Sequence, residues 1–449
     1  MEPHDGREQW GNRAGFMLAT LASAVGLGNI WRFSYVAGEN GGAAFLLVYV
    51  LCVLAIGLPA MLAELALGAR ARTDVVAAFA PAGVSRAWRA AGTLAALASF
   101  LILSYYSVVA GWACRYFTGY LDGSLARLPR ETLAADFAAF LADPAKPLIW
   151  HVAFMAATGT VVAAGVKRGI ERAARLLMPL LAALVLLLAG YALSLGGAAK
   201  AFAFLLVPDW SRLADPGLYL AAIGQVFFSL GIGMGVLVTY GSYVGSGVRL
   251  PGAAAVIAAG DTAFALIAGL AIFPAVFAFG LDPAQGPALA FETLPQVFAL
   301  MPGGRWFAVA FFFLLVTAAL TSAVSLLEVP VAYAMRRSGR SRLTVTVPLA
   351  LAAALAGIPA ALGTGVWRDI KLLGRAPLEA MDHIAADLLL PVAAIALVAF
   401  VGWALPRQET LAAADIRSAG LARAWHGAVR YLAPLAITLM LIANAVSIP

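Results

Sequence analysis

Long apolar stretches separated by short polar segments follow one another along nearly the whole chain. A helix needs about 20 apolar residues to cross the hydrocarbon core of a bilayer, and eleven stretches are long enough. The pattern therefore predicts an all-α polytopic membrane protein, with one transmembrane domain over residues 1–449 and no soluble domain. The predicted spans are residues 14–38, 42–68, 90–120, 148–166, 173–196, 217–244, 252–281, 304–336, 343–362, 376–405 and 425–447.

The composition supports this prediction. Of the 449 residues, 63% are hydrophobic and 12% are charged, whereas a soluble domain has about 25% charged residues. A water-soluble enzyme, a disordered chain and a fibrous protein are excluded. The net charge of +7 arises from basic residues in alternate loops, which is the positive-inside pattern of membrane proteins and predicts a cytoplasmic N-terminus. No nucleic-acid partner is expected, and with eleven spans the C-terminus should lie outside.

Two predicted spans are interrupted by glycines, in the sequences AVGLGN at residues 24–29 and SLGIGMG at residues 229–235. Glycine costs up to ~1 kcal/mol in a helix relative to alanine, so the helix should loosen at both places, although close helix packing is an alternative reading. The interruptions occupy corresponding places in residues 14–196 and 217–405, with 425–447 as an extra helix. Matched interruptions of this kind indicate a 5+5 inverted repeat with discontinuous first and sixth helices and a transport site between them.

Several polar side chains lie inside predicted spans, where each charge costs at least ~2.5–3.5 kcal/mol. A structural role is the simpler reading for most of them, because Ser and Thr often bond to their own helix and acids pair between helices. Asp261 is different, because a carboxylate at that depth needs either a proton or a cation. The charged positions are Arg32, Glu64, Asp261, Glu328, Asp382 and Asp387, and the nearby oxygen ligands are Asn29, Ser229, Thr321 and Ser322.

These motifs resemble those of the neurotransmitter:sodium symporter family, and most of all its bacterial amino-acid transporters of the leucine-transporter type. The likeness runs in order through nearly the whole chain. It is carried by REQW at 7–10, AVGLGNIWRF at 24–33, ENGG at 39–42, GQVFFSL at 224–230 and LTS at 320–322. The resemblance implies the inverted-repeat fold of that type and a place in the bacterial cytoplasmic (inner) membrane.

The resemblance implies two sodium sites and one substrate site. The first sodium site would use Ala24, Asn29, Ser229 and Asp261 together with the carboxylate of the substrate. The second would use Ala22, Val25, Ala318, Thr321 and Ser322. The substrate residues would be Ala24, Gly26, Leu27, Gly28, Ile102, Tyr106, Phe228, Ser229, Gly231, Met234, Ser322 and Leu326.

The resemblance also implies two gates. Arg32 and Asp382 would form the outer gate above Phe228, with Gln225 beside Arg32. The inner gate of the family pairs an N-terminal Arg, here Arg7, with an Asp, but Arg336 stands at the Asp position. Two arginines cannot form that ion pair, so closure on the inside is expected to depend on Trp10, Ser242, Tyr243 and Glu8.

Chloride-dependent members have an Asn where Asp261 stands and a small polar residue where Ala265 stands. Asp261 would supply the negative charge that chloride supplies elsewhere, so chloride should not be required.

The sequence therefore predicts sodium-coupled symport of neutral, hydrophobic or aromatic, L-amino acids into the cell by alternating access, in a lipid bilayer. A proton-coupled carrier on the same fold, in which Asp261 titrates, is the nearest alternative. A sensor that binds without transporting is another. An enzyme is not expected, because the four histidines are scattered along the chain and no nucleophile or metal cluster accompanies them.

Overall fold

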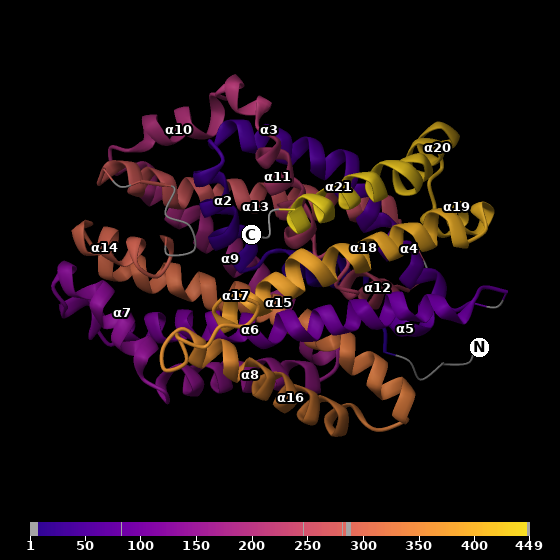
Figure 1. The fold of residues 1–449 in the computed structure, drawn as a ribbon, viewed down its shortest axis with the longest axis horizontal. Helices are drawn as coiled ribbons and strands as arrows, with labels where there is room; N and C mark the ends of the chain where they lie inside the picture. The colour runs from indigo at the N-terminus through magenta and orange to yellow at the C-terminus, as the bar shows by residue number, and fades with distance from the viewer. Residues whose placement is uncertain (1–7, 82, 246, 281, 284–288, 447–449) are drawn as a thin grey trace.

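The computed structural model describes residues 8–81, 83–245, 247–280, 282–283 and 289–446. Helices make up the regular structure of these residues, and the β-type pairing among them is an isolated bridge between Leu372 and Arg375. The all-α class predicted from the sequence is confirmed. Figure 1 shows long helices lying side by side across the view, joined by shorter helices at the two ends of the bundle.

The predicted spans coincide with long helices or with helices in series, several of which contain a turn of π-helix. The bounds are α1 (Arg13–Ala24), η1 (Gly28–Arg32) and α2 (Phe33–Glu39); α3 (Ala43–Cys52), η2 (Val53–Gly57) and α4 (Leu58–Ala71); α6 (Arg89–Leu121); α8 (Lys146–Ala163); η6 (Val166–Glu171) and α9 (Arg172–Leu193); α11 (Pro216–Leu230) and α12 (Val236–Ser242); α13 (Leu250–Ala278); α15 (Gly304–Ser338); α16 (Arg342–Gly363); α17 (Pro377–Asp382), η9 (His383–Leu389), α18 (Leu390–Ala399) and η10 (Phe400–Ala404); and α20 (Ala419–Gly427), η11 (Ala428–Leu432) and α21 (Ala433–Val446).

Eight helices among the described residues are long and apolar enough to cross a membrane, and α1 with η1 and α2, bent by 50°, makes a ninth span. Helices also occupy the two other predicted spans, as α8 and as α11 followed by α12. The count of eleven spans and the repeat boundaries at 14–196 and 217–405 stay predictions.

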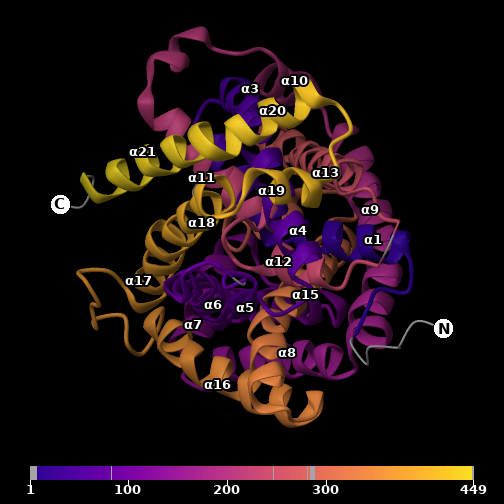
Figure 2. The ribbon, with the colours of Figure 1, turned by 90° about the vertical axis from the view of Figure 1, so that its right-hand side faces the viewer.

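Short helices mark the two ends of the bundle. At one end lie α7 (Leu133–Ala142) and α14 (Thr293–Leu300), and at the opposite end lie α5 (Val75–Ala78) and α19 (Arg407–Ala414) (Figure 1). The centre of the bundle is formed by α6 and α15, which Figure 2 shows surrounded by the other helices.

Aromatic rings close the bundle at the α7 end. Tyr116 of α6 stacks on Phe312 of α15 with ring centroids 4.6 Å apart, and Phe137 of α7 stacks on Phe291 with centroids 5.9 Å apart. Stacked and edge-to-face rings add about 0.5–1.5 kcal/mol per pair beyond their buried area. The cluster therefore ties the loops at this end to the central pair of helices.

Candidate functional site

The two glycine-rich interruptions are breaks in the helices, as the sequence predicts. Helix α1 ends at Ala24, Val25 is extended, and helical structure resumes at Gly28 in η1. Helix α11 ends at Leu230, and Gly231, Gly233 and Gly235 have φ values of +67°, +85° and +72°. Glycine adopts this left-handed backbone at little cost, whereas other residues pay roughly 1–2 kcal/mol. Each break exposes backbone N–H and C=O groups that a continuous helix would use internally.

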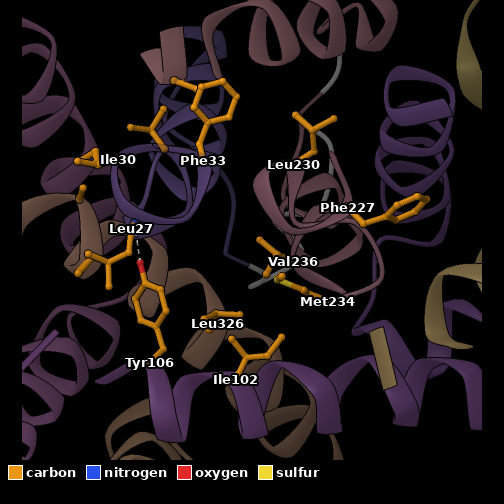
Figure 3. Close-up of a cluster of buried hydrophobic side chains, with 14 of the residues drawn as sticks. Leu27, Ile30, Phe33, Ile102, Tyr106, Phe227, Leu230, Met234, Val236 and Leu326 are labelled. Carbon is orange, nitrogen blue, oxygen red and sulfur yellow. Dashed lines mark hydrogen bonds between the residues drawn. The ribbon is translucent and has the colours of Figure 1, made fainter. Parts of the chain in front are cut away.

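Buried side chains from neighbouring helices bind these freed backbone groups. The carboxylate of Glu64 in α4 accepts the N–H of Gly233 at 2.6 Å. The hydroxyl of Tyr106 in α6 accepts the N–H of Leu27 at 3.1 Å (Figure 3). Gln225 donates to the carbonyl of Gly28 at 3.1 Å. The breaks are therefore held in place by the scaffold, and the structure gives Glu64 the helix-holding role expected of it.

Three of the predicted first-sodium residues meet at one buried point. The Asp261 carboxylate of α13 accepts the Asn29 amide of η1 at 2.7 Å and the Ser229 hydroxyl of α11 at 2.8 Å. The hydroxyl of Tyr49 in α3 lies 3.4 Å from the same carboxylate. Asp261 and Asn29 are 0% exposed and Ser229 is 2% exposed. Donor groups from both broken helices and from α3 thus converge on one carboxylate of α13, within a region closed to bulk solvent, and the amide oxygen of Asn29 accepts the backbone N–H of Gly26 at 3.1 Å.

The predicted second-sodium residues lie where α1 runs against α15. The Thr321 hydroxyl donates to the carbonyl of Ala318 at 2.8 Å, and the Ser322 hydroxyl donates to the carbonyl of Ser23 at 3.0 Å. A hydroxyl that donates keeps its lone pairs as acceptors. The oxygens of Thr321 and Ser322 are therefore still available to a cation. Ala22 is buried on α1, and Val25 is buried directly after the end of that helix.

A small cavity lies between the two breaks. Ten of the twelve predicted substrate residues line it, and Leu27 and Ser229 do not. Its volume is about 40 Å³, and its lining is Ser23, Ala24, Gly26, Gly28, Ile102, Tyr106, Phe228, Gly231, Met234, Val236, Ser322, Ser325 and Leu326. The side chains of Ile102, Tyr106, Met234 and Leu326 face one another in Figure 3. None of the lining residues is charged, so the walls are apolar with hydroxyl groups on one side.

A vestibule of about 400 Å³ adjoins this cavity, and Phe228 lines both. Arg32 lies over the Phe228 ring with its guanidinium carbon 4.8 Å from the ring centroid and donates to Gln225 at 2.7 Å. Asp382 accepts the hydroxyl of Tyr105 at 2.8 Å. Arg32 and Asp382 both line the vestibule, but within the described part of the chain no ion pair joins them. The predicted outer-gate residues therefore line one vestibule, and the ion pair that would close this gate is not formed between them.

The opposite end of the site is closed by an ion cluster that the sequence analysis missed. Arg342 at the start of α16 pairs with Glu8 and with Glu328 of α15, the latter at 2.6 Å. The hydroxyl of Tyr243 donates to Glu328 at 2.6 Å, and the backbone N–H of Trp10 donates to the carbonyl of Tyr243 at 3.1 Å. Burial, which outweighs the attraction of Arg342, raises the pKa of Glu8.

The expectation for this inner side therefore needs correction. Arg336 pairs with Asp74 at 3.0 Å, and Ser242 donates to its own helix at Thr239. Trp10, Tyr243 and Glu8 do lie at the closure, but the basic partner is Arg342. Its sequence signal is weak, because it stands among four arginines between 336 and 342 that fit the positive-inside pattern equally well. Arg7 lies outside the described residues.

The site also contains a pair of serines and a tyrosine that the sequence did not predict. Ser23 and Ser325 line the cavity and bond to each other at 2.7 Å, and Tyr49 reaches Asp261. Their positions along apolar helices carry no motif. Only the helix rotation, which the packing sets, turns them inward.

An apolar helical bundle whose two broken helices enclose a central cavity has the architecture of a secondary membrane transporter. The chain belongs to the Sodium:neurotransmitter symporter family, whose model matches residues 7–131 and 143–449. This confirms the family predicted from the sequence motifs, and it makes the protein a sodium-dependent, multi-pass membrane transporter and not an enzyme.

Relatives and a solved structure match over nearly the full length. A sodium-dependent transporter of Bacillus subtilis, YhdH, is 39% identical over 437 residues, with 96% of each chain covered. A sodium-dependent transporter of Haemophilus influenzae is 31% identical over 451 residues, with 98% of each covered. The crystal structure of MhsT in complex with L-phenylalanine is similar with a TM-score of 0.92 and 49% identity, covering 98% of this chain and 100% of that one.

Proposed function

We propose that the protein carries neutral, hydrophobic or aromatic L-amino acids into the cell together with Na⁺, by alternating access. The observation that carries this proposal is the convergence of Asn29, Ser229 and Asp261 beside the central cavity. The Asp261 carboxylate lies 2.7 Å from the Asn29 amide nitrogen and 2.8 Å from the Ser229 hydroxyl. With Na⁺ bound, an ionised Asp261, the Ser229 hydroxyl, the Asn29 amide oxygen and a freed carbonyl such as that of Ala24 would make an all-oxygen cage of low charge, which suits a hard monovalent ion.

The substrate carboxylate completes this cage in the proposal. It would receive the N–H groups of Leu27 and Gly28 and the hydroxyl of Tyr106, while the substrate amino group meets carbonyls freed at the end of α11. Gly26 favours a carboxylate at this position. Its missing side chain leaves room there, since a Cβ would lie only 3.0 Å from the Tyr106 hydroxyl oxygen. Because ion and substrate then share a contact, each strengthens the binding of the other, which is the coupling that symport requires.

The uncharged, largely apolar cavity supports a neutral hydrophobic side chain as the guest, and the structural relative MhsT holds L-phenylalanine. The cavity of about 40 Å³ is smaller than an engineered protein cavity of ~150 Å³ that binds benzene. A large guest therefore requires the walls to move. Met234 is the flexible wall residue, and Gly231 leaves its side of the cavity without bulk.

The second sodium ion would bind between α1 and α15, through the carbonyls of Ala22, Val25 and Ala318 and the hydroxyls of Thr321 and Ser322. This position links a mobile broken helix to the scaffold. At −100 mV each co-transported Na⁺ contributes ~2.3 kcal/mol in addition to its concentration gradient. Two ions would support steep accumulation of the amino acid.

The gates and the membrane setting complete the proposal. Arg32 and Asp382 would pair over Phe228 with Gln225 when the outer gate closes, and Trp10 and Tyr243 would separate from each other when the inner side opens. Arg7 remains a proposed gate residue. The protein would lie in the bacterial cytoplasmic membrane with its N-terminus inside and its C-terminus outside.

Sodium-dependent binding by the purified transporter tests the proposal. Binding of radiolabelled L-phenylalanine, with the other amino acids as competitors, would be compared in NaCl and choline chloride at constant pH. We expect binding only in NaCl, and a large loss in Asp261→Asn but not in Asp369→Asn, whose side chain is 94% exposed. Equal binding in both salts would contradict sodium coupling, and binding that follows pH alone would favour the proton-coupled carrier. Binding without uptake in liposomes would indicate a sensor.

Chloride independence is tested separately. We expect uptake to be unchanged when chloride is replaced by gluconate, because Asp261 carries the charge and Ala265 offers no anion ligand. A collapse of uptake in gluconate would refute this part of the proposal.

A further inference from the structure

Arg430 is a charged residue on a membrane-crossing helix, and it has no acidic partner in the part of the chain that the structure describes. It lies in η11, with its guanidinium carbon 5.5 Å from the Tyr431 ring centroid and 5.9 Å from that of Trp403 in η10. Its Nε is buried and has no hydrogen-bond partner. Among the described residues, no carboxylate forms an ion pair with it. A cation in this setting requires an anion as partner, because removing its donors from water costs free energy that no other interaction offsets.

Two more basic groups belong to the same place. His426, one helical turn before Arg430, is 6% exposed, and its Nε2 has no hydrogen-bond partner. The charges of Arg407, at the start of α19, and Arg430 both act on His426. The acid nearest to Arg407 along the chain, Glu409, is already paired with Arg70. The cluster of Arg407, His426 and Arg430, which we call the basic triad, therefore contains two buried nitrogens, His426 Nε2 and Arg430 Nε, that have no hydrogen-bond partner among the described residues.

The helix pattern places the basic triad at the edge of the bilayer core. Residues 431–446 carry no charge and are helical, and at 1.5 Å per residue these 16 residues span about 24 Å, most of the ~30 Å hydrocarbon thickness. The residues before them lead through α20, which carries Arg423, to the loop that carries Arg417. Trp403 and Tyr431 are 47% and 63% exposed, as is typical of aromatic side chains at a membrane interface. Arg430 thus lies at the depth of lipid headgroups, in η11 between α20 and α21.

We propose that the basic triad binds the phosphate of one anionic phospholipid of the leaflet on the N-terminal side. A phosphodiester offers several acceptor oxygens and one negative charge, which matches the forked donors of Arg430 and the unpartnered nitrogen of His426. Basic pockets between membrane helices on the cytoplasmic side are suited to such headgroups. The aromatic rings of Trp403 and Tyr431 hold the guanidinium at the interface, and the apolar surface of α21 next to them receives the acyl chains.

Lipid binding to the whole purified transporter tests this site. Protein stripped of lipid in a neutral detergent would be titrated with phosphatidylglycerol, phosphatidylcholine or inorganic phosphate. Bound lipid would be counted by native mass spectrometry and thermal stability followed in parallel. We expect one phosphatidylglycerol to be retained and to raise the Tm, while phosphatidylcholine does neither. Arg430→Gln should lower the phosphatidylglycerol affinity by about fivefold or more, since a basic residue near an anionic surface contributes ~1 kcal/mol.

Control variants make the result decisive. Arg417→Gln removes a basic residue from the loop between α19 and α20, outside the basic triad, and should leave the affinity unchanged, whereas His426→Gln, which keeps a polar side chain, should lower it. If Arg430→Gln fails to fold, Arg430→Lys and His426→Gln carry the test, because both keep polarity at the interface. Equal losses in the Arg417 and Arg430 variants would overturn the site in favour of a diffuse surface charge. A full effect of inorganic phosphate alone would overturn the lipid as its ligand.

Discussion

Replacing Tyr106 by Phe removes one oxygen from the centre of the proposed substrate site and leaves the ring in place. That hydroxyl lies 3.1 Å from the N–H of Leu27, at the edge of the cavity between the two helix breaks. In the proposed complex it donates to the substrate carboxylate. A hydrogen bond to a charged group is worth about 1.5–3 kcal/mol, and 1.4 kcal/mol is a factor of ten. We therefore expect Tyr106→Phe to weaken amino-acid binding by roughly 10- to 100-fold.

The fold should lose much less than the binding does. A neutral hydrogen bond contributes about 0.5–1.5 kcal/mol net to stability, and the cavity beside Leu27 allows a water to replace the missing oxygen. The assay is equilibrium binding of radiolabelled L-phenylalanine in NaCl, with the Tm of each variant recorded.

The adjacent Tyr105 supplies a matched control. Its hydroxyl donates to Asp382 in the vestibule at 2.8 Å, outside the small cavity, so Tyr105→Phe should change the affinity by less than about threefold. Unchanged binding in Tyr106→Phe, or equal losses in the two variants, would refute the assignment of the carboxylate to this hydroxyl.

Three other changes have defined outcomes. Gly233→Ala forces alanine to a φ of +85° with its Cβ 2.7 Å from a carbonyl oxygen of α18, so we expect a Tm several degrees below that of Gly190→Ala, whose Cβ meets open space; equal Tm values would contradict the strain argument. Met234→Ala enlarges the cavity and should raise the affinity for tryptophan relative to that for valine in competition assays, and an unchanged ratio would mean that another wall limits size. Burial raises the pKa of Glu8 beside Arg342, so the closed inner face binds a proton more tightly than an exposed Glu8 does, and closure should increase as pH falls through that raised pKa. Glu8→Gln should abolish this pH dependence in labelling of an engineered inner-face cysteine, and persistence of the dependence would point to another titrating group.

The helix breaks were predictable because they depend on local backbone preference. Glycine spacing at 24–29 and 229–235 weakens a helix wherever it occurs, and the structure shows the backbone leaving the helix at both places. Apolar stretches predicted the bundle for a similar reason, since a bilayer requires each span to satisfy its own hydrogen bonds. Polar residues at spans 1, 6 and 7 indicated the site because burying them is costly without partners.

The partners themselves depend on packing between distant segments. Tyr49 is 212 residues from Asp261 along the chain. Its side chain points toward Asp261 because packing sets the rotation of α3 about its own axis. The same holds for Ser23 and Ser325, which are 302 residues apart. No local pattern marks such residues, because the sequence does not show which face of an apolar helix a serine or tyrosine occupies relative to the site.

The sequence by itself determined that this chain is a membrane bundle, where its helices break, and which family of transporters it belongs to. The tertiary structure alone decided that Arg342, and no other arginine of the 336–342 run, meets Glu8 and Glu328, and that Arg430 meets no acid within the described residues. Apolar runs and glycine spacing act between neighbouring residues of one segment, so they can be recognised directly in the sequence. The pairing of charges depends on how separate helices pack, whether the partners are 14 residues apart, as Glu328 and Arg342 are, or 334, as Glu8 and Arg342 are.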